Sequence, residues 1–319
     1  MIAAGSLLGV AVNREKYSFP VGKVDLLHMY PLDMEEFFWA MGHEKLSGEI
    51  RACYIDNTPL SSLLHETAMN LYKQYLILGG MPAVINEFRK SQRLLDAVNV
   101  QGVIVSTYVA DMAKYATPAE TTRIMAAFQS IPAQLSKDNR KFQYKIVQRG
   151  GSAALFGASI DWLCAAGLVL KCNKIEQPQV PLAVHQDFAS FKLYMGDVGL
   201  LTFRSGMPAH NILTPVDGGN TFMGVITENY VAVQLRINCK DLYYWESSNT
   251  AEIDFLIQDA DRIIPVEVKA GEHTKSRSLS VYTQKYKPDH AIRIAAKNFG
   301  FENKIRSLPL YAVFWCDLV

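Results

Sequence analysis

The sequence has few cysteines, and they form no recognisable pattern. The five cysteines are an odd number, are widely scattered and include no CxxC pair; they are Cys53, Cys164, Cys172, Cys239 and Cys316. A disulfide framework or a structural zinc site needs cysteines at short, regular spacings or beside metal-spaced histidines. This absence argues against both, and we expect reduced thiols in a cytoplasmic protein.

Long apolar runs and a secretory signal are also missing. A membrane-spanning helix needs roughly 18 uncharged apolar residues, and the run Tyr75–Ile85 is far too short. The apolar N-terminal residues 1–12 have no basic segment ahead of them, which a secretory signal requires. We expect neither secretion nor membrane association.

An excess of charge of one sign is the third absence. The chain has 32 basic and 31 acidic residues and a formal net charge of +1, so no overall field draws it to nucleic acid or an anionic membrane. Any such binding has to be local. With 319 residues and 49% hydrophobic residues, the chain has the composition of an ordinary globular protein with two or three domains.

Helical signals begin at Pro31. Residues 1–12 and part of 17–30 have the apolar character of strands, whereas Asp33 is suited to cap a helix over the segment MEEFFWAMG, with Glu35 and Glu36 in its first turn. A second helix, Leu60–Leu78, is expected to end at Gly79-Gly80. The first third therefore predicts two strands followed by helices.

The middle of the chain predicts two helices and a β-hairpin. Helical spacing covers Thr121–Gln129 and Ala154–Ala166, and the strand candidates are Leu168–Lys171 and Phe191–Tyr194. This order is typical of a winged helix. After a turn at Gly218-Gly219, the last third predicts an α/β unit made of helix Glu228–Asn238 and strands Leu242–Glu246, Glu252–Ile257, Ile263–Lys269 and Leu310–Trp315.

Two carboxylates and one amine form the candidate catalytic site. Glu267 and Lys269 lie two positions apart on a strand and share a face. Asp254 precedes Glu267 by thirteen positions with a turn between them, so a hairpin would bring the two acids together. Asp254 and Glu267 offer oxygen ligands that suit Mg²⁺, Lys269 is placed to orient a nucleophile, and Glu228 is a fourth candidate.

This order resembles that of the PD-(D/E)XK nuclease superfamily, with a helix glutamate, an aspartate and a Glu-x-Lys tripeptide in sequence. The alternative interpretation is that Glu-Val-Lys is the solvated face of an amphipathic strand, or that the site is inactive. Glu246 and Glu252 flank the hairpin and either belong to the site or face water.

A basic cluster in the middle segment is the second candidate site. Lys137, Arg140, Lys141, Lys145 and Arg149 are interleaved with Phe142 and Tyr144. Such a cluster can neutralise DNA phosphates without reading sequence. Asp138 lies inside it, and a solvated charged face is the alternative.

Eight segments carry a closer resemblance. They are FPVGKVDLLHMYPLDMEEFF, YLILGGMP, SIPAQLSKDNRKFQYKIV, WLCAAGLVLKC, FKLYMGDVGLL, ENYVAVQL, LYYWESSNTAEIDFLI and IPVEVKAG. In this order they resemble a prokaryotic AAA+ ATPase family with a C-terminal domain of unknown function. The resemblance implies a mixed α/β, multi-domain fold: an AAA+ sheet remnant (1–30), a helical lid region (31–117), a winged-helix-like domain (118–205) and a PD-(D/E)XK nuclease-like domain (206–319).

The sequence departs from this family in one essential motif. It lacks a GxxxxGK[ST] phosphate loop, because Gly22-Lys23 is followed by Val24 and has no earlier glycine at the required spacing. Ser6 would match the residue that senses the γ-phosphate, but that role is idle without the loop. We expect no ATP site. The remaining hypotheses are a Mg²⁺-dependent, DNA-associated nuclease, a non-catalytic DNA- or protein-binding or self-associating scaffold, and a truncated gene product.

Overall fold

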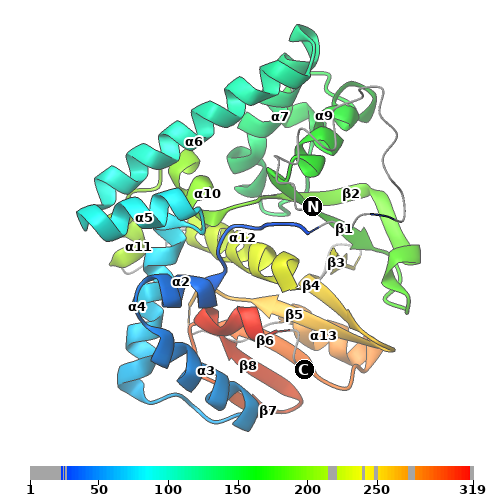
Figure 1. Cartoon of the computed structure of the whole chain (residues 1–319). Coiled ribbons are helices and arrows are strands. Elements are labelled where there is room, and N and C mark those ends of the chain that lie inside the picture. Colours follow the sequence, from blue (N-terminus) through cyan, green and yellow to red (C-terminus); the bar gives the residue numbers. More distant parts are fainter. Residues whose placement is uncertain are drawn as a thin grey trace.

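The computed structural model has a mixed α/β architecture (Figure 1). It describes residues 23, 25, 27–214, 221–238, 241–247, 251–271 and 277–316. The predicted strand over residues 1–12, Ser6 and the Gly218-Gly219 turn lie outside these ranges. Residues 27–30 do lie inside them and form no strand, contrary to the expectation, since Leu27 and Met29 are almost fully exposed and pair with no neighbouring strand there.

Five helices form the N-terminal part of this structure. They are α2 (Met34–Ala40), α3 (Glu44–Asp56), α4 (Ser62–Leu78), α5 (Pro82–Ser91) and α6 (Leu94–Tyr115). Asp33 caps α2 as predicted, because its carboxylate accepts the Glu36 N–H at 2.8 Å and the Glu36 side chain accepts the Asp33 N–H at 3.1 Å. α4 ends at Gly79, as expected, with a φ of +73° that favours glycine.

The middle segment contains the expected helices and hairpin. Its elements are α7 (Pro118–Leu135), α8 (Tyr144–Val147), α9 (Ala153–Ala165), β1 (Val169–Ile175), the 3-10 helix η1 (Leu182–His185) and β2 (Gln186–Met195). β1 and β2 pair antiparallel, and the two strands are longer than the apolar runs that predicted them. Two further helices follow, α10 (Val198–Ser205) and α11 (Ala209–Leu213).

The C-terminal part completes one mixed sheet. Its elements are α12 (Thr221–Asn238), β3 (Leu242–Glu246), β4 (Glu252–Asp259), β5 (Arg262–Val268), α13 (Arg277–Tyr286), β6 (Ala291–Ala295), β7 (Gly300–Glu302), β8 (Ile305–Pro309) and the 3-10 helix η2 (Leu310–Trp315). The eight strands have the order β2-β1-β3-β4-β5-β6-β8-β7. The hairpin of the middle segment therefore continues into the C-terminal sheet through the parallel pair β1–β3.

Two apolar clusters cover the two faces of this sheet. Tyr230 and Val231 of α12 pack in the larger cluster with Phe255 and Val266. The smaller cluster joins Leu279 and Tyr282 of α13 to Trp245 and Ile253. The strands are thus held between α12 and α13 (Figure 1).

The predicted strand Leu310–Trp315 is wrong, since this segment is the helix η2. It is an uninterrupted apolar run, and such a run has no period that separates a buried strand from a buried helical turn. Its carbonyl groups find partners on α12: the Tyr230 hydroxyl donates to Leu310 at 2.8 Å, and the Asn238 amide donates to Phe314 at 2.6 Å. These hydrogen bonds satisfy backbone carbonyls that in a strand would be paired with a neighbouring strand.

Candidate functional site

Asp254 is held at the end of the β4–β5 hairpin. The two strands pair antiparallel, with Phe255 opposite Val266 and a turn after Asp259. Oδ2 of Asp254 accepts a hydrogen bond of 2.8 Å from the backbone N–H of Val268. Val268 lies between Glu267 and Lys269 in the sequence, so the hairpin brings Asp254 next to the Glu-Val-Lys tripeptide.

Glu267 and Lys269 form an ion pair that reaches solvent on one side. Nζ of Lys269 lies 2.6 Å from Oε1 of Glu267, and 37% of the Lys269 side chain is exposed, whereas Glu267 is only 3% exposed. The Lys269 N–H donates to the carbonyl of Ile294 at 2.8 Å, which fixes the end of β5 against β6. The amine neutralises the buried acid from its solvent side.

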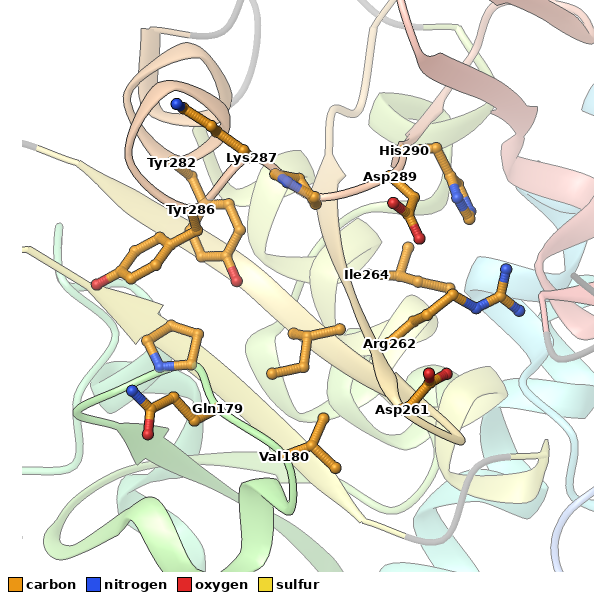
Figure 2. A pocket seen from close by; sticks show the side chains of 13 residues that line it. Gln179, Val180, Asp261, Arg262, Ile264, Tyr282, Tyr286, Lys287, Asp289 and His290 are labelled. Carbon is orange, nitrogen blue, oxygen red and sulfur yellow. The ribbon is translucent and has the colours of Figure 1, made fainter.

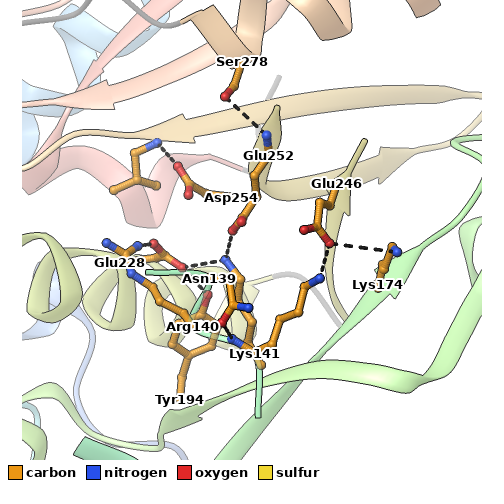
Figure 3. Close-up of polar contacts among 12 residues, drawn as sticks. Asn139, Arg140, Lys141, Lys174, Tyr194, Glu228, Glu246, Glu252, Asp254 and Ser278 are labelled. Carbon is orange, nitrogen blue, oxygen red and sulfur yellow. Dashed lines mark hydrogen bonds and ion pairs between the residues drawn. The ribbon is translucent and has the colours of Figure 1, made fainter. Parts of the chain in front are cut away.

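Glu228 has different surroundings. It is 1% exposed, and its Oε1 accepts hydrogen bonds from Nζ of Lys192 at 3.0 Å and from the Tyr194 hydroxyl at 2.5 Å. Its Oε2 forms an ion pair with Arg140. Figure 3 shows Glu228 at the centre of these contacts, with Asp254 bonded separately to the backbone of β5.

The charges around Glu228 balance within the protein. Lys192 is fully buried and pairs with both Glu228 and Glu252, and the Arg140 guanidinium supplies the second positive charge. We call these four residues, Arg140, Lys192, Glu228 and Glu252, the buried ion cluster. Burying a charge is costly unless it is paired and hydrogen-bonded. Burial also raises the pKa of Tyr194 far above its ordinary value, so its hydroxyl stays protonated and donates to Glu228.

Local backbone features bring Arg140 to this cluster. Arg140 has a φ of +48°, a left-handed conformation that is uncommon for a residue other than glycine. Gly224 lies one helical turn before Glu228 on α12, and a Cβ there would lie 3.4 Å from Nη2 of Arg140. α12 therefore passes directly beside the guanidinium at Gly224. The loop before α8 is thus fastened to α12.

The five residues of the predicted basic cluster have two kinds of surroundings. Arg140 pairs with Glu228, and Lys141 pairs with Glu246, whose carboxylate also lies 3.9 Å from Lys174. Lys137, Lys145 and Arg149 are exposed. The predicted cluster therefore combined two residues that form ion pairs within the protein and three that face solvent.

Lys192 was not among the predicted site residues. The alternation in β2 held a signal, because Phe191, Leu193 and Met195 are buried on one face while Lys192 and Tyr194 share the other. A lysine in an otherwise apolar run of a strand requires a buried acid as its partner. Glu252, which sequence reasoning left open between the site and solvent, is that partner together with Glu228.

Among the residues that the structure describes, no three or more His, Cys, Asp or Glu side chains are grouped so that they could hold a metal ion. Mg²⁺ often binds through only one or two carboxylates, with water completing its octahedron. Asp254 and Glu267 are the pair whose donor chemistry fits such a site. Glu228 fits it poorly, since both its oxygens already contact cations.

Comparisons with known protein families match two parts of the chain. Residues 69–211 match the domain of unknown function DUF8612, and residues 223–313 match the domain of unknown function DUF4143. DUF4143 is found in AAA-ATPase-associated proteins. Neither a curated protein nor a solved structure gives a significant match. No helix within the described part of the chain has the length and apolarity needed to cross a membrane.

Proposed function

We propose that the chain is a DNA-associated, PD-(D/E)XK nuclease-like module of an AAA+ ATPase-family protein, with no ATP site of its own, and that its sheet is a non-catalytic scaffold. The resemblance of its segments to that family and the match of residues 223–313 to DUF4143 support the family part. The helix–helix–hairpin order over α7, α9, β1 and β2 supports a winged helix.

The buried ion cluster is the observation that carries the scaffold role. Glu228 occupies the position of the helix glutamate in the nuclease order, yet it contacts Arg140, Lys192 and Tyr194. Two positive and two negative charges already cancel there. A divalent cation would have to displace Lys192 or Arg140, and it would leave a buried amine or guanidinium without a partner.

Exposed basic residues support DNA association. Lys137, Lys145 and Arg149 face solvent within one short segment. Contacts of this kind bind phosphates without reading sequence, and the affinity falls as the salt concentration rises. The test is fluorescence anisotropy with a labelled random-sequence duplex over a salt series, beside a plasmid-nicking assay in Mg²⁺ and Mn²⁺. We expect salt-dependent binding without nicking. Absence of binding at low salt would refute the DNA part.

A second candidate function is metal-dependent phosphodiester cleavage. The bond from Val268 to Asp254 favours it, because it holds Asp254 beside Glu267 and Lys269. A Mg²⁺ ion held by Asp254 and Glu267 would polarise the phosphodiester and lower the pKa of a bound water. Lys269 would position the water or stabilise charge on the phosphate oxygens.

Nicking and metal-dependent melting separate the two candidates. A metal that binds only the folded state raises the melting temperature by mass action. Under the scaffold hypothesis, Mg²⁺ changes the melting temperature of neither wild type nor Asp254→Asn, and neither protein nicks DNA. Nicking by wild type that is lost in Asp254→Asn, together with a metal-dependent melt, would instead establish the enzyme.

The missing ATP site has its own test. A phosphate cradle needs successive backbone N–H groups of a glycine-rich loop and a lysine at its end, and the sequence has no such loop. Titration calorimetry with Mg·ATP should give no heat of binding. Micromolar affinity would contradict this part of the proposal.

A further inference from the structure

A pocket lies at the far end of the β4–β5 hairpin, away from the Asp254 end. It has a volume of about 370 Å³, near the low end of the roughly 300–1,000 Å³ that is usual for binding pockets. Four segments enclose it: the β1–β2 connection, the β4–β5 turn, the end of α13 and the loop before β6. Figure 2 shows the two tyrosines of α13 on one side and Arg262 and Asp261 on the other.

The base and walls of this pocket are apolar. Tyr282 is buried beneath it, Ile263 packs against the same apolar cluster, and Tyr286 lies beside them with its ring centroid 4.8 Å from that of Tyr282. Pro178 and Pro288 complete the walls. A large apolar side chain entering here would meet apolar and aromatic surface on several sides.

The rim of the pocket carries charges of both signs. Asp261 and Asp289 are exposed, and so are Lys287 and Arg262, the last of which also pairs with Asp259 outside the pocket. Burial, with the nearby guanidinium groups of Arg262 and Arg306, lowers the pKa of His290, so its imidazole is neutral at pH 7. Two acids and two bases at the rim leave no net attraction for a purely anionic or cationic ligand.

One wall of the pocket is open to solvent. Val180, on the β1–β2 connection, lines the pocket and is 41% exposed. Small-molecule sites usually enclose most of their ligand. An open pocket with an apolar base, an exposed apolar side chain in its wall and a charged rim has the arrangement of a protein–protein contact, with a central anchor and a polar border.

We infer that this pocket binds a segment of a partner protein, in which one large apolar or aromatic residue is flanked by an acidic and a basic residue. The apolar residue would fill the space between Ile263, Tyr282 and Val180. Its acidic neighbour would meet Lys287 or Arg262, and its basic neighbour would meet Asp261 or Asp289. This surface is separate from the basic residues proposed to contact DNA, so either proposal can fail without the other.

Selection from a random heptapeptide library tests the inference. The full chain is the bait, and Val180→Asp serves for counter-selection, because a carboxylate at the wall would oppose an apolar anchor. The matched control is Val184→Asp, a valine on the same connection that does not line the pocket. Circular dichroism melts establish that both variants are folded.

We expect enriched peptides that carry an apolar or aromatic residue between charges of opposite sign. Fluorescence polarisation should show binding to Val180→Asp weakened about tenfold or more, and binding to Val184→Asp within about twofold of wild type. Lys287→Glu should weaken the same peptides and favour versions whose acid is replaced by lysine, which tests the rim independently of the wall.

Three results would overturn the inference. One is a selection in which no peptide is enriched on wild type relative to Val180→Asp. Another is an enriched peptide that binds wild type and Val180→Asp equally. The third comes from sedimentation velocity: a wild-type dimer that Val180→Asp alone dissociates would assign the surface to a second copy of this chain rather than to another protein.

Discussion

Glu228 and Glu267 are both buried acids of the predicted nuclease motif, yet their surroundings differ. Glu228 contacts Arg140, Lys192 and Tyr194, all drawn from other elements and all at least largely buried. Glu267 pairs with Lys269, which directly follows its strand, and that lysine reaches solvent. The first acid joins distant segments of the chain, whereas the second is neutralised locally at an accessible edge. Position in a motif therefore does not fix what a carboxylate does.

The largest expected effect comes from removing the amine at the centre of the buried ion cluster. Lys192→Met keeps the length of the side chain but leaves Glu228 and Glu252 with one cation between them. Breaking a buried ion pair by deleting one partner costs about 3–5 kcal/mol, because the remaining charge is uncompensated. Urea denaturation should show a loss of unfolding free energy in this range.

Lys174→Met is the control for that measurement. Lys174 lies 3.9 Å from Glu246, at the limit of an ion pair, and Glu246 keeps its closer partner Lys141, so the loss of Lys174 should cost no more than about 1 kcal/mol. If both substitutions destabilise the protein equally, the buried ion cluster is not the structural element that the comparison makes it.

A third buried carboxylate sharpens the comparison, because it has only neutral partners. Asp197 accepts N–H bonds from Gly80 at 2.7 Å and Leu200 at 2.8 Å, and burial raises its pKa to about 6. For an acid whose pKa is higher in the folded state, the stabilisation is fully present below about pH 4. It is lost as the pH rises through about 6.

The difference in unfolding free energy between wild type and Asp197→Asn should therefore shrink by about 2 kcal/mol from pH 4 to pH 7. Denaturant titrations at several pH values give this difference. A difference that stays constant with pH would mean that Asp197 is ionised in both states.

Much of the fold could be predicted from local sequence signals. The Asp33 cap, the end of α4 at Gly79 and the β4–β5 hairpin depend on neighbours in the chain, and each was predicted. Leu310–Trp315 was assigned as a strand because its continuous apolar run has no period to distinguish the alternatives. Its partners on α12 are far away in the sequence.

The candidate site shows the same limit. Strand alternation was enough to expect Glu267 beside Lys269, since the two are two positions apart at the end of one extended segment. The partners of Glu228 come from the loop before α8 and from β2, and no local pattern specifies such pairing. For the same reason Arg140 and Lys141 were grouped with residues that face solvent.

The proposed DNA binding provides a test with a smaller effect, which separates the exposed residues of the basic cluster from the ion-paired ones. Replacing Lys145 and Arg149 with alanine should reduce the slope of log affinity against log salt by about 0.9 for each phosphate that the variant no longer neutralises. The folded state should be little affected, since both side chains are exposed. Anisotropy titrations over a salt series measure the slope. An unchanged slope would remove these two residues from the interface.

The smallest expected effect concerns Glu267 itself. Glu267→Gln removes the negative charge but keeps the shape of the side chain, and Lys269 can turn further into water because it is already partly exposed. The relief from burying a carboxylate offsets the broken ion pair. We expect a change in unfolding free energy within about 1 kcal/mol of zero by urea denaturation. Glu228→Gln should cost clearly more, because Lys192 has no route to solvent and loses half of its compensation. Equal costs would mean that the two acids have the same structural role, and the distinction between the buried ion cluster and the partly exposed Glu267–Lys269 pair would be lost.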